Sequence, residues 1–139
     1  MATALHTFTD IFNTEIEYQG EVIPLKKIVI PIIQRDYAQG REGADIARVR
    51  MRFLDSLYRA VTEAPVTLDF IYGDIDQSGI MTPLDGQQRL TTLFLLHWYA
   101  AKKAALEPSE YEFLKCFSYE TRYSARDFCS LLISFAPSF

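Results

Sequence analysis

A polar block of five residues, Asp85-Gly86-Gln87-Gln88-Arg89, lies between a predicted strand and the most apolar helix that the chain can form. Apolar side chains then cover most of the circumference of that helix: Leu90, Leu93, Phe94, Leu95, Leu96, Trp98 and Tyr99. A helix that is apolar on nearly every side is stable in a protein interior. We therefore expect a central buried helix that starts near Asp85, with the rest of the chain arranged around it.

Strand and helix patterns alternate around this helix. β-branched and alternating segments bounded by turn residues predict short strands at 15–18, 27–30, 66–72 and 80–84. Apolar spacings of three and four predict an amphipathic surface helix from Asp45 to Glu63, and Ser124 with Asp127 is typical of the start of a last helix. The sequence predicts one domain over residues 1–139 with an α/β (α+β) fold, in which a small mixed sheet packs against helices.

Composition narrows the class of protein. The chain has 139 residues, 49% of them hydrophobic, which suffices for one buried core. Its two cysteines, Cys116 and Cys129, are too few for a disulfide framework or a four-ligand zinc site. No secretion signal opens the chain, and its most apolar stretch is shorter than the ~20 residues of a membrane span. We expect a cytoplasmic protein without a membrane partner.

The block from Asp85 to Arg89 has two open interpretations. In the first, Asp85 caps the helix, Gln88 returns a hydrogen bond to the amide of Asp85, and Arg89 forms a surface ion pair. In the second, the free amides and positive dipole of the helix start, with close approach at Gly86 and the guanidinium of Arg89, bind an anion such as phosphate.

Two further groups of polar residues follow predicted strands. Gln34, Arg35 and Tyr37 come after the apolar strand that ends at Pro31, where polar side chains can face a cleft or Arg35 can form a structural ion pair. Residues 74–79, with Asp85, match the spacing of a calcium-binding loop. Because strands flank this segment and Pro83 interrupts it, we interpret it as a polar hairpin turn.

The net charge of −4 hides an asymmetry along the chain. Residues 26–59 contain eight basic and four acidic side chains, so this segment carries +4 and the remainder −8. Phosphate contacts from this segment can hold DNA without reading its sequence, and a solvated helix face is the alternative. The candidate nucleic-acid-binding residues are Arg41, Arg48, Arg52 and Arg59. His97 on the apolar helix is interpreted as a core residue, and His6 as part of a mobile terminus.

Three ordered blocks resemble a known family. They are Ile30-Pro31-x-x-Gln34-Arg35-Asp36-Tyr37, then Leu84-Asp85-Gly86-Gln87-Gln88-Arg89-Leu90-Thr91-Thr92-Leu93, and then 117–124 followed by Phe128. Together they resemble the GmrSD restriction endonuclease N-terminal domain family, whose domain is ParB-like. The resemblance implies a ParB/sulfiredoxin-like core, a role in defence against foreign and often modified DNA, and an HNH-type nuclease domain or subunit as partner.

The resemblance also implies a nucleotide site. Its cofactor is a nucleoside triphosphate (GTP, ATP or another) with Mg²⁺, bound through Gln34, Arg35, Tyr37, Gly86, Gln88 and Arg122. The catalytic candidates are Asp85, Gln87 and Arg89, and Asp85 also places the metal. Hydrolysis stays open, and we expect no nuclease activity from this chain alone, because family members continue well beyond the length of this chain and it therefore resembles their front part.

Three hypotheses follow. The first is a regulatory domain that binds a nucleoside triphosphate, with Arg35 and Arg89 neutralising phosphate charge. The second is a module that binds DNA or senses its modification through Gln34, Arg35, Tyr37 and the arginine-rich face. The third is an inactive fragment that serves as an interaction domain.

Overall fold

The computed structural model describes residues 5–31, 43–120 and 123–138, except for the side chains of Ile46 and of residues 123–127. Within these residues the fold is mixed α/β, as the sequence predicts. The chain divides into two compact units, which we call the first unit (Met1–Ile32 with Ile71–Phe139) and the second unit (Ile33–Phe70). Each is described by itself below.

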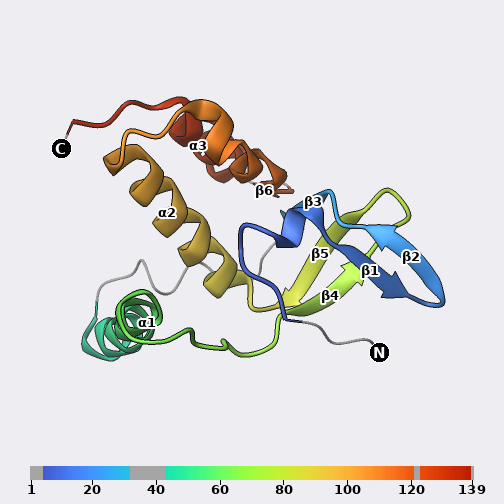
Figure 1. The fold of residues 1–139 in the computed structure, drawn as a ribbon, viewed down its shortest axis with the longest axis horizontal. Coiled ribbons are helices and arrows are strands. Elements are labelled where there is room, and N and C mark those ends of the chain that lie inside the picture. Colours follow the sequence, from blue (N-terminus) through green and yellow to red (C-terminus); the bar gives the residue numbers. More distant parts are fainter. Residues whose placement is uncertain (1–4, 32–42, 121–122, 139) are drawn as a thin grey trace. The chain divides into compact units, whose positions relative to one another are not determined.

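A mixed sheet of four strands forms the centre of the first unit (Figure 1). Its order is β4-β5-β3-β6, with bounds β4 Tyr72–Ile75, β5 Ile80–Asp85, β3 Lys27–Ile30 and β6 Phe117–Tyr119. β3 runs parallel to both β5 and β6, whereas β4 pairs antiparallel with β5. The carboxyl ends of β5, β3 and β6 therefore lie at one edge of the sheet, together with the first residue of β4.

A separate hairpin precedes the sheet. β1 (Glu15–Tyr18) and β2 (Glu21–Pro24) pair antiparallel through a two-residue turn in which Gln19 and Gly20 both have positive φ, 52° and 82°. This is the geometry that two-residue hairpins favour. The Tyr18 hydroxyl donates to Oδ1 of Asp74 at 3.2 Å, which ties the hairpin to β4. The strands predicted at 15–18 and 27–30 are confirmed.

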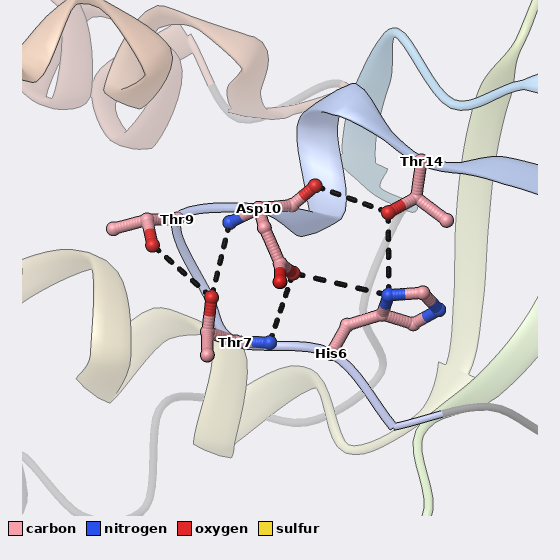
Figure 2. A network of polar contacts seen from close by, with 5 residues as sticks. All are labelled: His6, Thr7, Thr9, Asp10 and Thr14. Carbon is pink, nitrogen blue, oxygen red and sulfur yellow. Dashed lines mark hydrogen bonds and ion pairs between the residues drawn. The ribbon is translucent and has the colours of Figure 1, made fainter.

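The segment before the hairpin is held by its own polar contacts (Figure 2). The Thr7 amide donates to Oδ1 of Asp10 at 2.9 Å, and the Asp10 amide donates to Oγ1 of Thr7 at 3.2 Å. Nδ1 of His6 lies 3.2 Å from the Thr14 hydroxyl and 3.8 Å from the Asp10 carboxylate. Asp10 precedes the short helix η1 (Ile11–Asn13). His6 thus has defined partners, so its interpretation as part of a mobile terminus is wrong.

The strand predicted at 66–72 is also wrong, because only its last residue belongs to a strand. β4 begins at Tyr72 and pairs with β5 as far as Ile75, opposite Met81. The turn between them is closed by Asp76, whose Oδ1 accepts from the amides of Ser78 (2.8 Å) and Ile80 (3.1 Å). These bonds confirm the hairpin-turn interpretation of this segment.

The helix α2 (Gln87–Lys103) begins just after β5 ends and packs against β6 (Figure 1). Leu90 and Phe94 are 1% and 0% exposed, and the Phe94 ring stacks on that of Phe117 in β6 with centroids 4.9 Å apart. His97 is half-buried: its Nδ1 lies 2.7 Å from the Leu93 carbonyl and its ring packs on Phe8, so it lies at the margin of the core.

Two further elements complete the first unit. The 3-10 helix η3 (Pro108–Cys116) leads directly into β6. The last helix α3 (Tyr123–Ser134) lies against α2, where the Trp98 indole N–H donates to the Leu132 carbonyl. Burial raises the pKa of the Cys129 thiol to about 11 and also raises that of Cys116.

The second unit contains one described helix, α1 (Ala44–Thr62), one residue from the predicted bounds at each end. Arg48, Arg52 and Arg59 recur at spacings of four and seven, so they share one stripe of this helix. No helix among the described residues is long and apolar enough to cross a membrane.

Candidate functional site at the start of helix α2

The turn from β5 into α2 differs from the predicted capping box. Asp85 is the last residue of β5, and Gly86 occupies the N-cap position with φ 82° and ψ 9°. Among the described residues, no side chain caps the helix start through a hydrogen bond. The prediction that Asp85 caps the helix is therefore wrong. The reason is backbone geometry, since the chain leaves the strand through a left-handed residue, a conformation that glycine adopts without steric cost.

Gly86 is also a point of close approach. A Cβ at this position would lie 2.5 Å from Cγ1 of Ile71 and 3.1 Å from Nη2 of Arg89. The guanidinium of Arg89 therefore reaches back to Gly86, the N-cap residue of its own helix. This brings a positive charge to the helix end that already has the positive dipole potential.

The first turn of α2 presents backbone amides at the same place. The first hydrogen bond of the helix runs from the Leu90 amide to the Gly86 carbonyl at 3.0 Å. The amides of Gln87, Gln88 and Arg89 precede it and have no acceptor within the helix. Nε2 of Gln87 donates to the Pro83 carbonyl at 2.8 Å, which fixes the helix start against β5.

The three sequence blocks meet around this helix start. Thr91, in the second block, places its hydroxyl 2.7 Å from the hydroxyl of Tyr119, in the third block. Tyr119 is the Cα partner of Ile30, in the first block, and the Glu120 amide donates to the Ile30 carbonyl at 2.8 Å. The second block follows the first by about fifty residues, and the third follows the second by about thirty. Described residues of all three are thus joined at the carboxyl edge of the sheet.

Three residues of this region were not singled out for a role from the sequence. In the sequence, Thr91 and Tyr119 belong to the second and third blocks, and Tyr72 ends a predicted strand. Tyr72 is the Cα partner of Asp85. Strand register, which brings Tyr72 and Asp85 together, has no local signal in a single sequence. The polar residue Thr91 within an apolar helix was the one available indication.

Several predicted site residues lie outside the described residues: Gln34, Arg35, Tyr37, Arg41 and Arg122. Asp85, the predicted metal ligand, is exposed, and no group of three or more metal-ligating side chains occurs in the described part of the chain. A single carboxylate suits Mg²⁺ that is bound mainly by phosphate oxygens and water, and it does not make a metal site formed by protein alone.

The arginine stripe of α1 is partly neutralised. Nη2 of Arg48 lies 3.5 Å from the Asp45 carboxylate, and both side chains are well exposed. Arg52 and Arg59 are exposed on the same helix. Exposed pairs of this kind contribute little to stability, so the contact leaves the arginines able to change partners.

These features define a small mixed α/β domain with a glycine-led helix start, bordered by an arginine, at the carboxyl edge of its sheet. Residues 9–138 match the family model described as GmrSD restriction endonuclease, N-terminal domain. The chain belongs to this family, as its three blocks predict. Neither a curated protein nor a solved structure matches the chain significantly.

Proposed function

We propose that this chain is the nucleotide-binding regulatory domain of a DNA-targeting restriction enzyme, with the phosphates bound at the start of α2. Membership of the GmrSD N-terminal domain family supports the role in restriction. The single observation that carries the nucleotide site is the Gly86 turn, where Arg89 reaches back over the first turn of α2. Helix starts that begin at a glycine are well suited to phosphate groups.

Each group at the helix start has a distinct role in this proposal. The amides of Gln87 and Gln88 donate to phosphate oxygens, and the Arg89 guanidinium neutralises their charge. Gln87 holds the turn through its bond to the Pro83 carbonyl. Asp85 is the side chain that would hold Mg²⁺ on the phosphates, and Mg²⁺ supplies further charge neutralisation when it is bound. Following the family resemblance, we also assign Gln34, Arg35, Tyr37 and Arg122 to nucleotide binding, and a ParB-like core to the fold.

Calorimetric titration tests the proposal. The chain is titrated with Mg²⁺ and each of the four common nucleoside triphosphates, and phosphate release is followed separately to detect hydrolysis. We expect saturable binding of at least one triphosphate. Absence of binding to all four at millimolar concentration would overturn the proposal, whatever the result for hydrolysis.

A matched pair of variants locates the site. Arg89→Ala removes the guanidinium at Gly86 and should abolish triphosphate binding, whereas Arg52→Ala removes an exposed arginine of α1 and should leave it unchanged. Melting temperatures of both variants control for folding. Equal triphosphate affinity in Arg89→Ala and the unsubstituted chain would contradict the assignment.

A second candidate function is DNA binding through α1. The observation in its favour is the stripe of Arg48, Arg52 and Arg59. Binding through phosphate contacts weakens steeply with salt. We expect duplex DNA to bind at low salt and to be lost in Arg52→Ala/Arg59→Ala. Undetectable binding of intact and modified duplexes at low salt excludes this function.

A further inference from the structure

An exposed tyrosine begins the edge strand of the sheet at the point where α2 starts. Tyr72 is the first residue of β4, and its Cα partner in the antiparallel ladder is Asp85. The next pair is Gly73 with Pro83, so the register shifts between Tyr72 and Gly73 and Leu84 is the extra residue of a β-bulge. The Tyr72 backbone therefore lies beside that of Asp85, the residue that precedes Gly86.

The backbone before Tyr72 is fixed against the same helix start. Ile71 packs against Gly86, because a Cβ there would lie 2.5 Å from Cγ1 and 3.2 Å from Cβ of Ile71. Tyr72 is thus bound on two sides, by contact of its neighbour with the α2 turn and by pairing with the last residue of β5. The backbone of Tyr72 is therefore held close to the start of α2.

The ring of Tyr72 is available to a ligand. The side chain is 52% exposed, and within the described residues it takes part in no hydrogen bond, ion pair or ring contact. Other tyrosines of the first unit differ in this respect. Tyr18 donates to Asp74, and the Tyr119 hydroxyl lies 2.7 Å from that of Thr91.

We propose that Tyr72 is the stacking platform for the base of the nucleoside triphosphate. This inference rests on the proposed function, which places the phosphates at the start of α2. Arg89 and the helix amides then hold the phosphates of the ligand. The Tyr72 ring, at the neighbouring end of β4, contacts the π-face of the base. Stacking on an aromatic ring is tolerant of base identity, so the four triphosphates should bind with similar affinity.

Two ligands separate the base contact from the phosphate contact. Inorganic tripolyphosphate has the charge without the base, so both it and the nucleoside triphosphates are titrated with Mg²⁺ into each variant. Tyr72→Leu keeps an apolar side chain but removes the ring, and it should bind nucleoside triphosphates roughly tenfold more weakly, within the range of base–aromatic stacking. Its affinity for tripolyphosphate should not change.

Two control variants test whether the loss of affinity comes from the aromatic ring at position 72. Tyr72→Phe keeps the ring and should bind nucleoside triphosphates as the unsubstituted chain does. Tyr58→Leu removes an exposed tyrosine of α1 and should have no effect. Upfield shifts of the base protons on binding, lost in Tyr72→Leu, give a direct spectroscopic sign of stacking.

The outcomes are distinguishable. Nucleotide affinity that is equal in Tyr72→Leu and the unsubstituted chain overturns the role of Tyr72 and leaves the phosphate site standing. An equal loss of nucleotide and tripolyphosphate affinity in Tyr72→Leu also overturns it, because the substitution would then act through the phosphate site. If the unsubstituted chain binds neither ligand, the proposed function and the role of Tyr72 both fail.

Discussion

The hydroxyl groups of Thr91 and Tyr119 lie 2.7 Å apart, joining the first turns of α2 to the end of β6. Thr91 also donates to the Gln87 carbonyl at 3.0 Å, which uses its single hydroxyl proton. Tyr119 is therefore the donor in the contact between the two side chains. This bond connects the carboxyl end of β6 to the helix whose start forms the candidate site.

Removing the hydrogen bond between Thr91 and Tyr119 should lower the free energy of unfolding. In Tyr119→Phe the Thr91 hydroxyl keeps its bond to Gln87 but loses a donor, so the free energy of unfolding should fall by about 1 kcal/mol. Chemical denaturation with urea measures the change. Tyr58→Phe, at an exposed position of α1, is the control and should change nothing. A Tyr119→Phe variant as stable as the unsubstituted chain would show that the bond adds no stability.

Two glycines with the same positive φ allow a matched test of the α2 turn. Gly86 and Gly20 both have φ 82°, but a Cβ at Gly20 meets no atom within 4 Å, whereas at Gly86 it meets Ile71 at 2.5 Å. Gly20→Ala should cost about 1 kcal/mol, the price of a left-handed alanine. Gly86→Ala should cost about 1 to 3 kcal/mol more because of the clash.

A double-mutant cycle tests whether the clash with Ile71 causes the extra loss of stability. Its four proteins are the unsubstituted chain, Gly86→Ala, Ile71→Ala and the double variant. Gly86→Ala/Ile71→Ala relieves the clash, and its coupling free energy in a double-mutant cycle should be favourable. Thermal and urea unfolding of the four proteins measure it. Equal losses of stability in Gly86→Ala and Gly20→Ala would contradict the close approach at Ile71.

The buried thiol of Cys129 predicts a pH dependence. Burial raises its pKa to about 11, whereas in the unfolded chain the thiol has its ordinary value of 9.0. The folded state therefore binds more protons between these values, and stability falls as pH rises from 9 towards 11. Below pH 9 the thiol is protonated in both states and contributes no dependence.

Comparison with Cys129→Ala isolates this effect from the lysines and tyrosines that titrate in the same range. The unfolding free energy of the unsubstituted chain should fall more steeply above pH 9 than that of Cys129→Ala. The contrary result, parallel curves for the two proteins, would mean that the thiol ionises equally in both states.

Local patterns were sufficient for elements that depend on local physics. The β-branched run Lys27–Ile30 and the apolar periodicities of α1 and α2 predicted their elements to within a few residues. The strand predicted at 66–72 failed because strand formation depends on a partner. β5 offers pairing only from Tyr72 onward, and Gly73 approaches the Thr82 carbonyl too closely for a side chain.

The sequence predicted where the candidate site begins and not its geometry, and its chemistry stays a prediction. The block from Asp85 to Arg89 correctly marked the junction of a strand and a helix. Aspartate and glycine both suit an N-cap, however. Only the left-handed backbone of the turn assigns that position to Gly86. The pairing of Tyr72 with Asp85 and the contact of Thr91 with Tyr119 depend on register and helix docking, which a single sequence does not determine.

The most direct test of nucleotide binding at the start of α2 is an NMR titration of the isotopically labelled chain with a nucleoside triphosphate and Mg²⁺, with the backbone amides assigned. We predict that the amides of Gly86, Gln87, Gln88 and Arg89 show the largest chemical-shift changes and saturate together with the calorimetric binding curve. Saturable binding that leaves these four amides unshifted, with the changes concentrated elsewhere in the chain, would contradict this prediction.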